Sequence, residues 1–105
     1  EEAAALARVR YFLEAHGEAR FTDLDDKDRD RVTINRAGFR RCTDAGTEYH
    51  VLPEVFRQEI CAGMDHRLVA GVLRTRGMLK TEAPDRLTIK TRNAGRVYCI
   101  LEDRS

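Results

Sequence analysis

The chain lacks the patterns that mark membrane and secreted proteins. No apolar run approaches the roughly 18–20 residues that cross a bilayer, so we expect no membrane partner. The first residues, Glu-Glu-Ala-Ala-Ala, include no initiator Met and no basic region before an apolar stretch. We therefore expect no signal peptide, and we expect these 105 residues to be one domain cut from a longer protein.

Several kinds of catalytic site also lack their residues. There is no Trp, and Ser105, the last residue, is the only Ser, which argues against a serine nucleophile. No Gly-rich phosphate loop is present, and the acidic residues 23–30 lack the Gly and the closing Glu of a calcium loop. A Cys–His pair remains conceivable, but no known local signature surrounds any Cys. We expect no catalytic site and no cofactor in this segment.

Cysteine is scarce and unevenly spaced. Cys42, Cys61 and Cys99 form an odd set that suits no secreted disulfide framework, and Cys61 and Cys99 lie in apolar stretches typical of buried thiols. This predicts a reducing, cytoplasmic location. A zinc site through Cys42, His50, Cys61 and His66 is the alternative, but structural zinc sites usually pair ligands two to four residues apart. We therefore expect no metal.

Charge is plentiful and unequally distributed. Apolar residues make up 42% of the chain and charged residues 35%, which allows one modest core under a charged surface. Residues 1–30 hold nine acidic and five basic residues, whereas residues 31–105 hold nine acidic and fourteen basic ones. The net charge of +1 thus permits a basic working face in the second part.

The first half of the chain predicts one helix and a strand pair. Residues 2–16 have the apolar spacing of an amphipathic helix, which Gly17 would close in the left-handed conformation. The charged residues 23–31 predict a solvated loop. Residues 32–35 and 49–52 alternate like strands, and the turn residues between them predict an antiparallel pair.

The second half predicts two helices and a hairpin. Pro53 opens a helix that extends to about Ala62, and Asp65 caps a second helix that ends near Arg76. Residues 87–90 and 97–101 flank Asn-Ala-Gly, which is a hairpin signal.

This order predicts an α+β winged helix: a helix, a β-hairpin, a helix-turn-helix and a C-terminal β-hairpin wing. The predicted core residues are Leu6, Val9, Leu13, Val55, Phe56, Ile60, Leu68, Val72, Leu73, Leu87, Ile89, Val97 and Cys99.

If the second helix of the pair is a recognition helix, its outer face should carry groups that bind DNA. The helical wheel places His66, Arg67, Ala70, Gly71 and Arg74 on that face, where two small residues would let the backbone approach a groove. The wing would add Lys90, Arg92 and Arg96 as phosphate contacts. These cations can equally be ordinary solvated charges.

Five stretches resemble a known family: residues 34–41, 49–56, 59–65, 77–80 and 96–100. Together they are similar to the C-terminal segment of a bacterial family labelled as a domain of unknown function, whose members are large ATPases of phages and integrative elements. Some relatives look like the MCM-like replicative helicases of mobile elements, in which a C-terminal winged helix follows an AAA+ motor. The resemblance implies an accessory domain of a DNA-replication helicase, with the missing motor as a partner and a possible route to oligomers.

Two functions therefore remain open. The chain is either a non-catalytic DNA-binding domain or a docking and regulatory module that packs on the ATPase motor and does not contact DNA. The basic residues after Arg67 favour the first function, and the acidic segment 23–30 favours the second.

Overall fold

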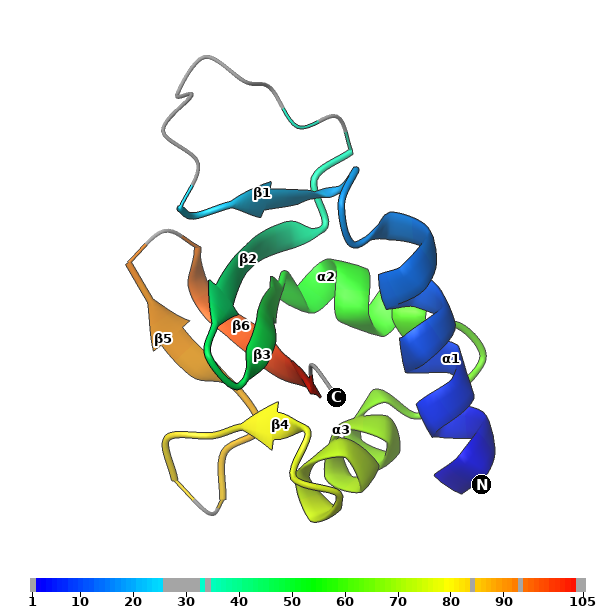
Figure 1. Ribbon diagram of the computed structural model, residues 1–105. Coiled ribbons are helices and arrows are strands. Elements are labelled where there is room, and N and C mark those ends of the chain that lie inside the picture. Colours follow the sequence, from blue (N-terminus) through cyan, green and yellow to red (C-terminus); the bar gives the residue numbers. More distant parts are fainter. Residues whose placement is uncertain (1, 26–32, 34, 84, 93, 104–105) are drawn as a thin grey trace.

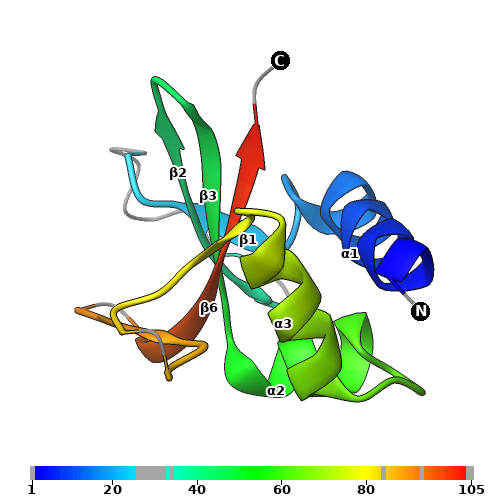
Figure 2. The same ribbon diagram turned by 90° about the horizontal axis from the view of Figure 1, so that it is seen from below.

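The computed structural model describes residues 2–25, 33, 35–83, 85–92 and 94–103, and it shows an α+β fold. Helices α1 (Glu2–His16), α2 (Pro53–Val55) and α3 (His66–Thr75) lie on one face of a six-stranded sheet, as Figures 1 and 2 show. A π-helix, η1 (Phe56–Ile60), continues α2 directly. Strands β1 (Phe21–Asp23), β2 (Gly38–Thr43), β3 (Gly46–Val51) and β6 (Gly95–Asp103) follow one another across the sheet.

The long strand β6 is the centre of the sheet. It pairs antiparallel with β3 on one edge, and with β4 (Leu79–Lys80) and β5 (Ile89–Thr91) on the other. The predicted C-terminal hairpin is confirmed, since Ile89 lies opposite Val97 and Thr91 opposite Gly95. Residues 81–83 and 85–88 lie between β4 and β5, on the side of the sheet away from the helices (Figure 2).

The first strand pair differs from the prediction. The partner of β3 is β2, at residues 38–43 and not at 32–35. Asn35 lies in a turn with φ 52°, while residues 32 and 34 are outside the described residues. The register requires glycine at position 38, because a Cβ there would lie 1.9 Å from the His50 carbonyl oxygen. Charged residues within β2 conceal its strand character from a hydrophobicity pattern.

The segment after α1 also differs from the prediction. Gly17 does not adopt a positive φ, and its role is close packing, since a Cβ would lie 2.5 Å from the Leu13 carbonyl oxygen. Phe21–Asp23 forms β1, parallel to β2, where the prediction placed only a loop from residue 23. Of that loop, residues 26–31 lie outside the described residues.

The core lies between the sheet and the three helices. Alternate residues of β3 and β6 point into it, so that Tyr49, Val51, Tyr98 and Ile100 are buried against the helices. Most of the predicted core is confirmed, with Leu6, Val55 and Leu87 partly buried and packed against the core. Leu68 was predicted inside but is 53% exposed, so that prediction is wrong.

Candidate nucleic-acid interface

Helix α3 begins and ends where the sequence predicts. The Asp65 carboxylate accepts a hydrogen bond from the Arg67 backbone N–H at 3.0 Å, which satisfies one of the free donors of the first turn. Gly77, with φ 72°, follows the last turn in the left-handed conformation. Both ends of α3 are therefore determined by local chemistry.

One face of α3 is buried and the other is free of core contacts. The buried residues are Val69, Ala70, Val72 and Leu73, so the predicted outer position of Ala70 is wrong. The exposed residues are Arg67, Leu68, Arg74 and Thr75, with Gly71 partly exposed among them and His66 partly exposed at the first position. Helix α3 packs against α1, with Ala70 on its buried face and Leu68 exposed.

Gly71 lies at the middle of this exposed face. A Cβ at Gly71 would have no atom within 4 Å, so nothing inside the described part of the chain requires glycine there. Glycine within a helix costs up to about 1 kcal/mol relative to alanine. A glycine that no internal contact requires leaves room for another molecule to approach the α3 backbone closely.

The helix before α3 is firmly anchored. Arg20 forms a two-bond ion pair with Glu59 of η1, at 2.7 and 2.9 Å, and its Nε donates to the Asn35 carbonyl oxygen. The hydrogen bond from Arg20 lowers the pKa of the Glu59 carboxyl group. On the inner side, Phe56 stacks on Tyr98 with ring centroids 4.0 Å apart. The helix-turn-helix unit is thus fixed on strand β6.

Tyr98 marks the point where η1, α3 and β6 meet. Burial raises the pKa of its hydroxyl group, and the nearby guanidinium groups of Arg57 and Arg67 partly offset that rise. Arg57 was not among the predicted site residues, although it is exposed on η1 beside Phe56. Like Arg67, it is an exposed cation whose charge acts on Tyr98.

The β5–β6 hairpin carries the other predicted cations. Lys90 and Arg96 are directly opposite each other, and Arg92 is exposed in the turn between the strands. The Thr91 hydroxyl group organises this turn, since it donates to the Gly95 carbonyl oxygen at 3.0 Å and accepts from the Ala94 N–H at 3.2 Å. Two like charges opposite each other destabilise a strand pair unless an anion lies nearby.

Glu82 is that anion, and the sequence prediction missed it. Its carboxylate accepts hydrogen bonds from the Lys90 backbone N–H and, at 3.4 Å, from Arg96 Nη1. These contacts lower the pKa of Glu82, with the Lys90 hydrogen bond as the largest cause. Arg96 also donates to the Thr88 carbonyl oxygen at 3.3 Å, so part of the hydrogen-bonding capacity of its guanidinium group is used within the protein. The only sequence signal was an acid in the segment leading to the hairpin.

The predicted site residues therefore form two groups. His66, Arg67 and Arg74 are on α3, whereas Lys90, Arg92 and Arg96 are on the hairpin. Strand β4 and the segment after it lie between α3 and β5 (Figure 1). On β6, Arg96 is two residues before Tyr98, whose hydroxyl group feels the charge of Arg67.

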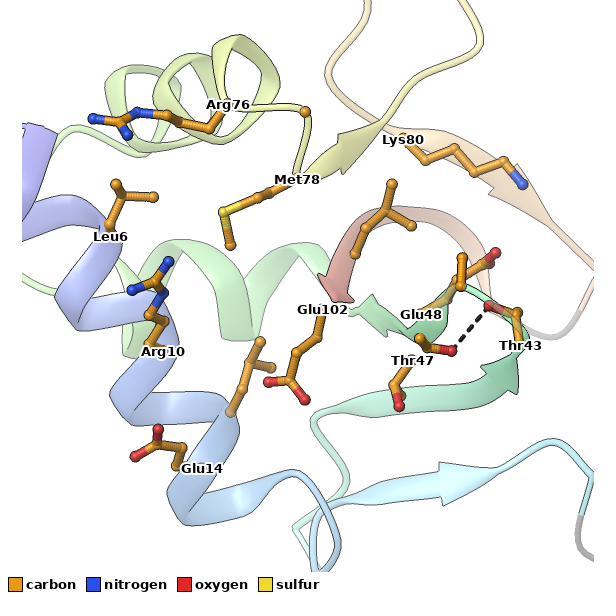
Figure 3. A pocket seen from close by; sticks show the side chains of 15 residues that line it. Leu6, Arg10, Glu14, Thr43, Thr47, Glu48, Arg76, Met78, Lys80 and Glu102 are labelled. Carbon is orange, nitrogen blue, oxygen red and sulfur yellow. Dashed lines mark hydrogen bonds between the residues drawn. The ribbon is translucent and has the colours of Figure 1, made fainter. Parts of the chain in front are cut away.

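A groove of about 1050 Å³ lies elsewhere, between α1 and the ends of β3 and β6 (Figure 3). Its lining carries charges of both signs, with Arg10, Arg76 and Lys80 beside Glu14, Glu48 and Glu102. Arg76 is paired with Glu2 at 3.2 Å. Mixed charge of this kind does not favour a polyanion, so the groove is a weaker candidate for DNA than α3.

The zinc set weighed from the sequence is not assembled. Cys42 is exposed on β2 and Cys61 is buried in the core, while His66 is on α3. Within the described ranges, the group that could hold a metal is a different one, formed by Glu48, His50 and Cys99. Burial of Cys61 and Cys99 is as predicted.

The scan of protein-family models and the searches of curated proteins and solved structures found no match to this chain. In the described part of the chain, none of the helices has the length and apolar character required to cross a membrane.

Proposed function

We propose that the chain is a non-catalytic DNA-binding domain of the winged-helix type. In this proposal α3 enters a groove of the duplex and the β5–β6 hairpin contacts the neighbouring backbone. The order α1, β3, α2–η1, α3, β4, β5, β6, with β3 on one edge of β6 and β4 and β5 on the other, supports the architecture. Strands β1 and β2 would be additions ahead of it.

The observation that carries the proposal is the exposed face of α3. Arg67 and Arg74 lie seven residues apart, two helical turns, with Gly71 between them. Guanidinium groups suit both phosphates and the acceptor edge of guanine, and a glycine between them permits close approach. Arg92 at the hairpin tip is a further exposed cation for the backbone.

The resemblance noted in the sequence extends the proposal to a biological context. The domain would be the C-terminal part of an AAA+ replicative helicase of a mobile element, and it would position the ATPase motor on duplex or forked DNA. The motor would then be its protein partner and the source of ATP-dependent activity.

A docking function is the second candidate, and one observation favours it. Leu68 is 53% exposed on the same face of α3, and a large exposed apolar side chain suits an apolar protein surface better than a phosphate backbone. In this case α3 would pack on the motor or another protein, and the cations would form the rim of that interface.

Salt dependence separates the two candidates. We expect fluorescence anisotropy of the chain with labelled duplex, forked and single-stranded DNA to show binding whose log K falls linearly with log salt concentration, because phosphate contacts release counterions. Contacts from Arg67, Arg74 and Arg92 would give a slope of about −3 on duplex DNA. A chain that stays folded and binds none of the three DNAs at low salt would contradict DNA binding and favour docking.

A further inference from the structure

Three side chains with metal-binding atoms meet on the face of the sheet opposite the helices. Glu48 and His50 are two residues apart on β3, and Cys99 of β6 lies directly opposite His50. Because Tyr49 and Val51 point into the core, the alternate residues Glu48 and His50 point to the other face. Strand register alone therefore brings the three together.

Their ligand atoms are close to the spacing that a tetrahedral ion requires. Glu48 Oε1 lies 3.3 Å from His50 Nε2 and 3.8 Å from Cys99 Sγ, and all three atoms lie within 4.8 Å of one another. Zinc bonds of about 2.0 Å to nitrogen or oxygen and about 2.3 Å to sulfur separate tetrahedral ligands by about 3.3–3.5 Å. Small side-chain rotations would close the remaining difference.

Two residues of the cluster are buried, and the third, Glu48, is partly exposed to solvent. Cys99 is 0% and His50 7% exposed, while the Glu48 side chain is 18% exposed. Glu48 also lines the groove at the ends of β3 and β6, together with Lys80 (Figure 3). An ion could therefore reach the carboxylate from the groove and then engage the two inner ligands.

We propose that Glu48, His50 and Cys99 form a zinc site with one further position open to water. The combination of a thiolate, an imidazole and a carboxylate is a zinc donor set, whereas Mg²⁺ and Ca²⁺ prefer oxygen ligands alone. A divalent ion with one carboxylate and one thiolate carries no net charge, so its burial leaves no unbalanced charge inside the protein.

Without a metal, the Glu48 carboxylate accepts two hydrogen bonds, one from the His50 ring and one from the Cys99 thiol. Burial and the neighbouring Glu48 raise the pKa of the Cys99 thiol to about 12, so a zinc ion must displace the thiol proton. Lys80 opposite Cys99 and Arg41 opposite Glu48 add two cations that disfavour an ion. These costs predict moderate affinity and make direct metal titration the decisive measurement.

The site would link β3 to β6, and it is independent of the proposed DNA contacts. A ligand that binds only the folded state raises the free energy of unfolding by RT ln(1 + [L]/Kd). Zn²⁺ should therefore raise the unfolding temperature. DNA binding by α3 would not be required for this effect.

Titration of the chelator-treated chain with Co²⁺ tests the proposal. We expect one equivalent of Co²⁺ to produce the near-ultraviolet thiolate-to-cobalt absorption, which Zn²⁺ should abolish by displacement. Cys99→Ser should lose this band, and Glu48→Gln should weaken binding at least about tenfold, as loss of a ligand implies. Cys42→Ser is the matched control and should behave like the parent, because Cys42 is exposed and outside the cluster.

Three results would overturn the proposal: no thiolate band in the folded parent, a band that persists in Cys99→Ser, or a band lost in Cys42→Ser alone. Circular dichroism must show that each variant is folded. If Cys99→Ser does not fold, Glu48→Gln and His50→Gln decide the question, since parent-like cobalt affinity in both would contradict the assignment.

Discussion

Two leucines of α3 show how burial depends on position rather than residue type. Leu73 is fully buried, whereas Leu68 is 53% exposed, although the same hydrophobic pattern placed both in the core. Leu68 lies at the edge of the apolar stripe, and the pattern could not show that Ala70 occupies the inner position. The rotation of α3 about its axis depends on the elements that it packs against, α1 and β4 among them, and the sequence of one helix does not contain that information.

The same substitution at both positions tests this difference. Leu73→Ala should lower the free energy of unfolding by about 2–5 kcal/mol, because it removes buried surface and leaves a cavity. Leu68→Ala should change the free energy by no more than about 0.5 kcal/mol. Urea unfolding measures both values, and similar losses in the two variants would show that Leu68 is buried in solution.

Gly71 gives a prediction in which stability and binding move in opposite directions. Gly71→Ala should raise the free energy of unfolding by up to about 1 kcal/mol, since the added methyl group meets no atom within 4 Å. It should also weaken duplex binding if the α3 backbone contacts the groove. Thermal unfolding and anisotropy of the same sample provide the two readouts.

Gly77 is the matched control for stability. Its Cβ position is equally open, but its φ of 72° disfavours any L side chain, so Gly77→Ala should lower stability by about 1–2 kcal/mol. A Gly71→Ala variant that is more stable and binds DNA like the parent would exclude close approach at Gly71.

At the scale of elements, the sequence predicted those features that depend only on residues close together in the chain. The cap at Asp65, the terminating Gly77 and the β5–β6 hairpin could all be predicted from the sequence. Strand β2 could not be, because its register depends on contact between Gly38 and the His50 backbone, twelve residues away. The pairing of Glu82 with Lys90 and Arg96 could not be predicted either, because the only signal was the presence of an acid in the segment before the hairpin.

Glu82 sets the electrostatics of the hairpin. Glu82→Gln keeps an oxygen acceptor for the Lys90 N–H but removes the charge that holds Arg96. We expect this variant to bind duplex DNA about two- to fivefold more tightly, the effect of one surface charge, with a steeper salt dependence. Asp85→Asn, an exposed acid of the same segment, is the matched control and should have a smaller effect. Unchanged or weaker binding by Glu82→Gln would argue that the hairpin does not contact DNA.

At the scale of the whole molecule, the sequence predicted the order of the main elements but not how they assemble. The α+β class and the final hairpin are confirmed, and the helical segments α2–η1 and α3 lie where two successive helices were predicted. The parallel β1–β2 pair and the β4 contact with β6 join segments far apart in the chain, so single-segment periodicity gives no sign of them. Likewise, the net charge of +1 conceals that the cations proposed to contact DNA divide between α3 and the hairpin.

DNA binding requires these two groups to act on one duplex. Arg67 of α3 and Arg92 of the hairpin turn are both exposed, and their positions on separate elements make them the best pair to test joint action. Arg8 and Arg10 of α1 are a matched pair of exposed cations, of which Arg8 donates to the Ala62 carbonyl oxygen at 2.9 Å.

Charge reversal at these two pairs, read by anisotropy with labelled duplex DNA, is the most direct measurement. Arg67→Glu with Arg92→Glu should weaken binding far more than Arg8→Glu with Arg10→Glu, and it should reduce the salt slope by about two, one for each lost phosphate contact. Circular dichroism must show both variants folded. Equal binding by the two double variants and the parent would contradict a DNA interface built from α3 and the hairpin.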